Sequence, residues 1–333
     1  MIKGKKLFVY FSLAILLTFF CFILSLSLGY SKLDLLDVLK VLTGQAPSGT
    51  VLIIRNIRLP RILVCLFAGA SLAISGQLLQ TLTRNPLADS GILGINTGAG
   101  MVVALMISYT DLLKLSFLNF MPFLATLGGI ATILFVYLIS FKKGQGTRPN
   151  RLIVAGIGVS TMLSSTMVAI VGNLDRYKVD YIASWLSGRI TGDNWQTIWV
   201  ISPFFFVLWL LVYLRSNQLN ILNLNEQTAL GLGIALQKER ILILLLSTGL
   251  AALSVLLVGN VTFVGLVAGH ITRKLVGSNH RISLPFAMLV GMMLLLIADT
   301  IGRVLLVGTG IPTGIVVSII GAPYFLYLMR QTK

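Results

Sequence analysis

Charged residues are scarce in this sequence, and acidic ones most of all. Asp, Glu, Lys and Arg make up 11% of the 333 residues, whereas a soluble domain keeps about a quarter of its residues charged. The 10 acidic residues are outnumbered by 26 basic ones, and 56% of the chain is hydrophobic. Long apolar runs with so little charge are typical of membrane proteins. The composition argues against a nucleic-acid-binding protein, which would need a basic face on a soluble domain.

Cysteine and histidine are nearly absent, and the common catalytic motifs are missing. Cys21 and Cys65 lie in apolar runs without CxxC spacing, so neither a disulfide framework nor a metal site is indicated. His270 and His280 have no Cys or carboxylate cluster beside them that would complete a metal site. The sequence contains no GxxxxGK[ST] phosphate loop, HExxH or GxSxG. We therefore expect neither an enzyme nor a resident cofactor, and any ATP must be hydrolysed by another chain.

Ten apolar runs are candidates for membrane-spanning helices. A helix that crosses the bilayer core of roughly 30 Å needs about 20 residues, and long runs without alternation favour helices over a barrel. The first run is too long for a signal-peptide core and lacks a small-residue cleavage site. We predict one all-α transmembrane domain over residues 1–333, and the eighth run is its shortest span. The runs are 7–29, 61–82, 91–109, 118–141, 151–172, 196–214, 241–258, 261–276, 283–307 and 312–329.

Basic residues indicate the orientation of these spans. If both termini lie in the cytoplasm, 16 of the 26 Lys and Arg residues fall on the cytoplasmic side, as the positive-inside bias expects. The outer side nevertheless keeps a cluster of Arg55, Arg58 and Arg61. Asp299 lies in the ninth run, four residues before Arg303, so both side chains share one helical face. Asp299 is either a functional group at membrane depth or half of an internal ion pair near the outer end.

Glycine clusters at 91–100 and 308–314 allow two interpretations. They either pack helices closely through small residues or break helices that line a cavity. Neither cluster follows a predicted strand, so a phosphate-binding loop is not indicated.

Three sequence blocks resemble the FecCD family of permease subunits from type II ABC importers. They are RLPRILVCLFAGASLAISGQLLQTLTRNPLADSGILGINTGAG (58–100), NVTFVGLVAGHITRKLVGSNHR (260–281) and IPTGIVVSIIGAPYFLYLM (311–329). The resemblance implies a fold of about ten helices like that of the cobalamin importer permease, with both termini cytoplasmic. It also implies a multi-pass protein of a bacterial inner or plasma membrane. Ser90 and Gly269 stand where the family usually has Pro, and Gly310 replaces a Glu.

The resemblance also implies partners and sites. The partners are a second permease subunit, two cytoplasmic ABC ATPases and an extracellular or periplasmic substrate-binding protein. Arg58, Arg61 and Arg303 match positions that dock the binding protein, and the 219–240 segment matches the loop that contacts the ATPase. In that segment the matching residues are Glu226, Ala229 and Gly233.

The cargo expected from the resemblance is a ferric siderophore, with haem and cobalamin as alternatives. Arg84 stands where siderophore-type members usually have a basic residue, and this favours a siderophore. The preference is weak because Arg84 lies at the cytoplasmic end, away from the expected pathway. The fifth and tenth spans are implied as walls of the pathway, although their hydroxyls could simply bond to helix carbonyls. A secondary transporter driven by an ion gradient is an alternative of another class, and it would need intramembrane carboxylates beyond Asp299. The expected pathway residues are Ser160, Thr161, Ser164, Ser165, Thr313 and Ser318.

Overall fold

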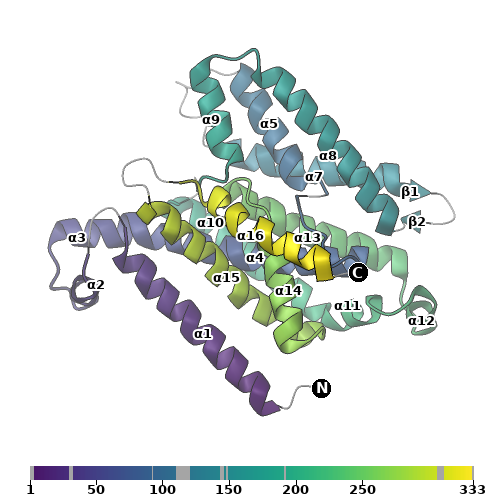
Figure 1. The fold of residues 1–333 in the computed structure, drawn as a ribbon, viewed down its shortest axis with the longest axis horizontal. Helices are drawn as coiled ribbons and strands as arrows, with labels where there is room; N and C mark the ends of the chain where they lie inside the picture. The colour runs from purple at the N-terminus through teal and green to yellow at the C-terminus, as the bar shows by residue number, and fades with distance from the viewer. Residues whose placement is uncertain are drawn as a thin grey trace.

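Helices dominate the computed structural model, which describes residues 4–29, 33–91, 93–109, 121–142, 146–147, 149–190, 193–305 and 311–331. Within these ranges the strands are β1 (Phe141–Lys142) and β2 (Gly146–Thr147), which pair antiparallel with Phe141 opposite Thr147. The predicted all-α class is confirmed, since this two-residue pair only closes the turn between two long helices (Figure 1).

Each of the ten predicted spans corresponds to one helix of the described residues. Eight apolar helices are long enough to cross a membrane, and α5 and α14 are shorter, with 15 and 13 residues. At 1.5 Å per residue α14 covers about 20 Å, less than the roughly 30 Å of a bilayer core. The eighth predicted span is therefore a short helix. The ten are α1 (Gly4–Ser27), α4 (Leu59–Thr83), α5 (Ile95–Tyr109), α7 (Met121–Ser140), α8 (Pro149–Val171), α10 (Trp195–Leu214), α13 (Leu236–Val258), α14 (Val264–Val276), α15 (His280–Leu305) and α16 (Thr313–Gln331).

Helix α4 is the centre of the packing. Of its 25 residues, 20 are buried, and it contacts α13, α14 and α15 along its length. A Cβ atom on Gly69 would lie 2.4 Å from the carbonyl oxygen of Gly291 in α15, and one on Gly76 would lie 2.4 Å from the Cα of Gly265 in α14. The backbones of these helices therefore touch, which is how small residues stabilise helix pairs in lipid.

The glycine cluster at 91–100 also allows helices to pack closely. A Cβ atom on Gly98 in α5 would lie 1.9 Å from the Thr132 hydroxyl oxygen of α7, so no larger residue fits there without rearrangement. In the second cluster, Gly314 packs against the carbonyl oxygen of Ser187, 2.5 Å from its ideal Cβ position. Residues 306–310, including Gly310, lie outside the described residues.

The short elements gather at the two ends of the molecule (Figure 1). One end carries α2 (Leu35–Leu42), α3 (Ser48–Leu52), a π-helical stretch η1 (Ile53–Arg58) that continues into α4, and α9 (Arg176–Leu186). The other end carries α11 (Ser216–Leu222), α12 (Glu226–Gly231) and the strand pair, and both termini lie toward it. Segments predicted to share a side of the membrane thus lie at the same end.

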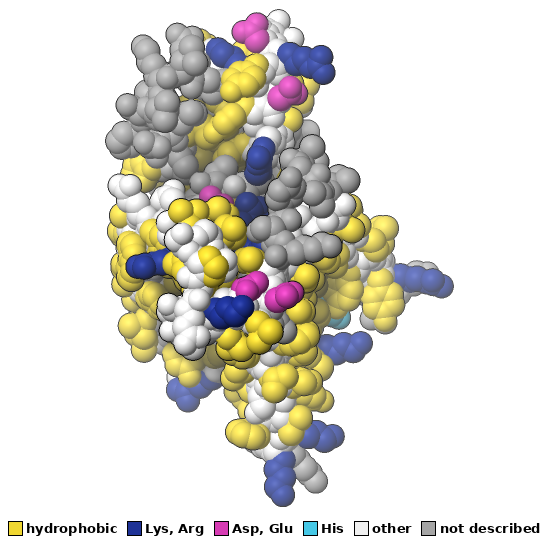
Figure 2. All heavy atoms as spheres, turned by 90° about the vertical axis from the view of Figure 1, so that its left-hand side faces the viewer, with side chains coloured by type: hydrophobic (Ala, Val, Ile, Leu, Met, Phe, Trp, Pro, Cys, Tyr) yellow, Lys and Arg dark blue, Asp and Glu magenta, His cyan; other side chains and the backbone are white. Residues whose placement is uncertain are grey.

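The periphery is hydrophobic. Of the apolar windows of α1, α8 and α10, only 6%, 17% and 22% are buried inside the chain. In Figure 2 the lower projection is α1, with a hydrophobic surface along its length and basic side chains at its tip. Exposed Lys5 and Lys6 lie in that first turn. An apolar helix with cationic groups at its end is suited to lipid contact, because the charges reach the headgroups.

Candidate functional site

A buried carboxylate organises the end that carries α2 and α3. Asp299 of α15 is 1% exposed, and its Oδ2 accepts a hydrogen bond from Nε of Arg303 at 2.9 Å. Its Oδ1 accepts from Nε of Arg61 in α4 at 3.0 Å and from the hydroxyl of Thr313 in α16 at 3.1 Å. The ion pair expected from the i, i+4 spacing is therefore formed, and a second arginine from another helix joins it.

The last turn of α1 is held by the neighbouring arginines. Arg58, which is 4% exposed, donates to the carbonyl oxygens of Leu26 and Ser27, the latter at 2.8 Å. Nη2 of Arg303 donates to the hydroxyl of Ser25 at 2.6 Å. The carbonyls at a helix C-terminus lack partners within the helix and form the negative end of its dipole, so guanidinium groups stabilise them.

The three predicted docking arginines are thus brought together, but each one is engaged within the chain. The Arg61 and Arg303 side chains keep 24% and 16% of their surface exposed. Arg58 is buried between α1 and α4, so it supports this surface from beneath.

At the opposite end, α11 and α12 form a compact projection. The Asn225 side chain caps α12 by accepting from the Thr228 amide at 2.7 Å, and Glu226 pairs with Arg240 of α13. Gly233 has φ +80 and open space around its Cβ position. Ala229 is fully buried in the chain's own core, so of the three predicted coupling residues only Glu226 and Gly233 lie on the surface.

Three leucines of this projection are exposed, and no role was predicted for them from the sequence. Leu224, Leu230 and Leu232 expose 43%, 57% and 57% of their surface, although they lie outside the long apolar helices. Clustered apolar side chains on a polar end usually mark an interaction surface. The signal in the sequence is the recurrence of Leu among the polar residues of LNLNEQTALGLG.

The predicted pathway hydroxyls have separate environments. Ser160 of α8 shares a 2.8 Å hydrogen bond with Thr97 of α5, and Thr313 belongs to the Asp299 cluster. Thr161 and Ser165 are exposed on α8 and donate to carbonyls four residues earlier, at 2.9 and 3.0 Å. Ser164 on α8 and Ser318 on α16 are partly exposed. Only part of the predicted set therefore shares an open face.

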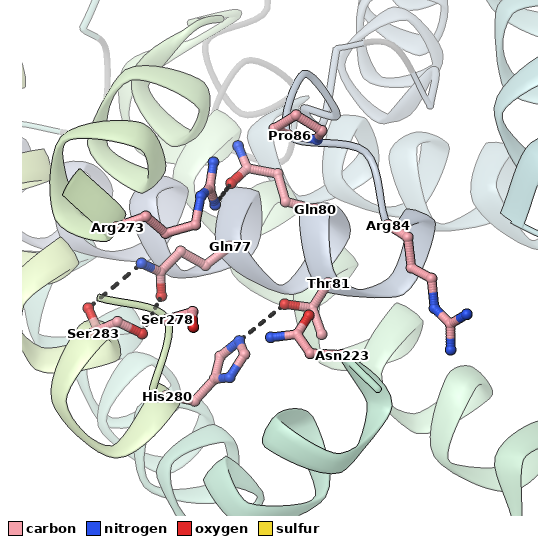
Figure 3. Close-up of a pocket in the computed structure, with 10 residues that line it drawn as sticks. All are labelled: Gln77, Gln80, Thr81, Arg84, Pro86, Asn223, Arg273, Ser278, His280 and Ser283. Carbon is pink, nitrogen blue, oxygen red and sulfur yellow. Dashed lines mark hydrogen bonds between the residues drawn. The ribbon is translucent and has the colours of Figure 1, made fainter. Parts of the chain in front are cut away.

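A polar cavity of about 260 Å³ lies beside the α11–α12 projection, between the end of α4 and the connection from α14 to α15 (Figure 3). The His280 ring bridges two helices across it. Its Nδ1 donates to Oδ1 of Asn220 at 2.9 Å, which leaves Nε2 to accept from the Thr81 hydroxyl at 2.9 Å. The lining residues are Gln77, Gln80, Thr81, Arg84, Pro86, Asn223, Arg273, Ser278, His280 and Ser283.

Arg84 ends α4 in a left-handed conformation, with φ 50. Its guanidinium donates to the carbonyl oxygens of Leu222 and Leu224, the former at 3.3 Å. Arg84, which the sequence analysis related to the cargo, therefore holds the joint between α11 and α12 against the end of α4. In the described residues no group of three or more His, Cys, Asp and Glu could hold a metal ion.

Comparison with known proteins identifies the family. A model of the FecCD transport family matches residues 16–331. The chain belongs to this family. FecCD members are transport components, and together with the long apolar helices this makes the chain a multi-pass protein of a bacterial inner membrane.

Among FecCD relatives, the Iron(3+)-hydroxamate import system permease protein FhuG of Bacillus subtilis (strain 168) is 38% identical over 99% of each chain. The Hemin transport system permease protein HmuU of Yersinia pestis is 36% identical over 84% of this chain and 83% of that one. A solved metal-chelate type ABC transporter in an inward-facing conformation superposes with a TM-score of 0.81 at 31% identity, covering 98% of each chain.

Asp299→Asn should destabilise the chain by about 2–4 kcal/mol, because it leaves two partly buried arginines without their shared counter-charge. The thermal unfolding midpoint of the purified chain in detergent measures this. Asp193→Asn is the matched control: this carboxylate is 34% exposed and lies 3.5 Å from Arg61, so its removal should cost less than about 1 kcal/mol. Equal shifts for the two variants would contradict the central role of Asp299.

Proposed function

We propose that this chain is the permease subunit of an ABC importer that moves ferric siderophore complexes into the cytoplasm. The observation that carries the proposal is the full-length similarity to an iron(3+)-hydroxamate permease. The arrangement of two functional ends supports it: an arginine cluster at one end and a compact projection with exposed leucines at the other. We place the α11–α12 end and both termini in the cytoplasm.

Coupling to an ion gradient is a weaker alternative. Such a carrier needs an intramembrane carboxylate that gains and loses a proton or Na⁺. Both oxygens of Asp299 are already engaged within the chain, by two guanidinium groups and a hydroxyl. Its role is better explained as structural.

The pathway is proposed to lie against the exposed face of α8, between this chain and a second permease subunit. Only 17% of the α8 window is buried within the chain, and Thr161 and Ser165 lie on the open part. A weakly polar wall suits a conduit, because a tight site would delay release of a bulky chelate.

Uptake of radiolabelled iron tests the function. A strain that lacks its own chelate permeases should take up a ferric hydroxamate when it expresses this chain with its ATPase and binding protein. Thr161→Trp should lower uptake at least tenfold by narrowing the pathway, while leaving the unfolding midpoint unchanged because Thr161 is exposed. Uptake of haem with no hydroxamate or catecholate chelate would overturn the siderophore assignment and favour haem, which Met162 on the same open face could contact.

Docking of the binding protein is proposed at Arg61 and Arg303. Arg61→Gln and Arg303→Gln should each slow association about tenfold at low salt, with a smaller difference near about 0.5 M salt, because such charges act mainly on the encounter rate. Surface-immobilised binding protein measures the rate. Arg58→Gln is the contrast in association: Arg58 is buried against α1, so it should leave the low-salt association rate of the folded chain unchanged. Unchanged low-salt association for both variants would remove these arginines from the docking surface.

The ATPase is proposed to bind the α11–α12 projection through its leucines together with Glu226 and Gly233. The double variant Leu230→Ser, Leu232→Ser should reduce co-purification of the ATPase at least tenfold, because apolar contacts at an interface core are lost. Both side chains are exposed, so the unfolding midpoint should hold. Lys238→Ser, an exposed change at the start of α13, is the control. Normal co-purification and transport by the leucine variant would exclude this projection as the coupling element.

A further inference from the structure

Among the residues that the structure describes, those lining the polar cavity at the α11–α12 end are all basic or neutral. Two of its ten lining residues are arginines, and the others are amides, hydroxyls, a histidine and a proline. Arg84, Asn223 and Ser278 are exposed at its rim, so the cavity communicates with the solution at this end. A space with net positive charge and many donors is suited to an anion.

Two donors beside this cavity have no acceptor in the described part of the chain. Gln80 is 5% exposed, and its Oε1 accepts a hydrogen bond from Nη1 of Arg273. The remaining nitrogens, Nε2 of Gln80 and Nη2 of Arg273, are buried without a hydrogen-bond partner. Figure 3 shows the two side chains meeting at the edge of the cavity. Buried donors are nearly always satisfied in folded proteins, so an orphan pair, one of them cationic, indicates a missing acceptor.

Within the described ranges, no acidic side chain supplies that acceptor through a salt bridge. The salt bridges of the described residues use Asp37, Asp193, Asp299, Glu226 and Glu239, and none of them involves Arg273. The nearby residue Gly269 of α14 makes the arrangement possible, since a Cβ atom there would lie 2.5 Å from Oε1 of Gln80. The glycine allows the Gln80 side chain to lie against α14 and reach Arg273.

We propose that this cavity binds a phosphate-type oxyanion, carried either by free phosphate or by a phospholipid headgroup, with Arg273 and Gln80 as the principal donors. A planar guanidinium binds phosphate oxygens through paired charge-assisted hydrogen bonds. The hydroxyls of Thr81 and Ser278 and the guanidinium of Arg84 border the same space. A bound anion would join α4 to α14 beside the joint that Arg84 fixes. The site goes beyond the proposed transport function and does not depend on it.

Binding of radiolabelled inorganic phosphate tests the site. The full chain is purified in a maltoside detergent without phospholipid, and binding is measured by equilibrium dialysis at constant ionic strength set with chloride. We expect saturable binding of one phosphate per chain. Arg273→Gln and Gln80→Leu should each weaken it at least tenfold, and Arg273→Lys should lie between them and the wild type, because it keeps the charge without the fork.

Lys274→Gln is the matched control, because Lys274 is the next residue of α14 and is exposed outside the cavity. It should bind phosphate as the wild type does. Thermal unfolding of each variant without phosphate identifies any that fail to fold, and Arg273→Lys keeps the test decisive if Arg273→Gln is unstable. Absence of saturable binding, or equal binding by folded Arg273→Gln and wild type, would overturn the proposal.

A second arm distinguishes the two sources of the anion. Wild-type chain reconstituted in phosphatidylglycerol nanodiscs should lose phosphate binding if a lipid headgroup occupies the cavity, and should keep it if the ligand is free phosphate. Either outcome upholds the oxyanion site, and transport activity enters neither measurement.

Discussion

Contact between helix backbones is the constraint on which the rest of this structure depends. Lipid provides no hydrophobic driving force between helices, so association relies on close packing. Gly69 against Gly291 and Gly76 against Gly265 bring α15 and α14 to the surface of α4. That closeness buries the polar middle of α4, with Ser71 and Ser75. Ser75 can then donate to the carbonyl of Ser247 in α13 at 2.8 Å.

The same helix carries the chemistry of both ends. Arg61 lies in its first turn and meets Asp299, whereas Gln80 and Arg84 lie in its last turns, beside the cavity and the α11–α12 joint. Its 25 residues span about 37 Å at 1.5 Å per residue, comparable to the bilayer. A binding protein at one end and an ATPase at the other would therefore act on a single packed element. In the proposed arrangement the binding protein would touch α4 at Arg61, and the ATPase would reach α4 through the α11–α12 joint that Arg84 fixes.

The sequence predicts the spans well because lipid imposes length and hydropathy on every crossing helix. The sequence overstates the length of the eighth span, because hydropathy counts apolar residues and does not show where the helix begins. The backbone at Gly259 and Phe263 has φ 69 and 68, so the chain turns there and α14 begins only at Val264. The spacing of Asp299 and Arg303 is local and predicts their pair correctly.

Other features depend on contacts between distant residues, which the sequence does not reveal. Arg61 reaches Asp299 across 238 positions and Arg273 reaches Gln80 across 193. The burial of Arg58, Ala229 and Thr313 depends on which side of each segment faces a neighbour. The exposed leucines of the α11–α12 projection were missed because the six-residue helix α12 and its flanking turns are too short to give a periodic signal.

The open face of α8 shows how hydroxyl groups can lie on the surface of an apolar membrane helix without forming a binding site. Thr161, Ser165 and Thr166 each donate to a carbonyl of their own helix, at 2.9, 3.0 and 2.9 Å. Their donors are satisfied before any cargo or partner arrives. These hydroxyl oxygens can still accept hydrogen bonds, and the side chains offer small apolar surfaces to a molecule that passes along the face. Such a face tolerates water or a chelate at little desolvation cost, yet it offers no directed donors that would retain the cargo. The internal hydrogen bonds of these hydroxyls are therefore compatible with a role in a pathway wall, and they explain why such a wall carries no recognisable binding motif.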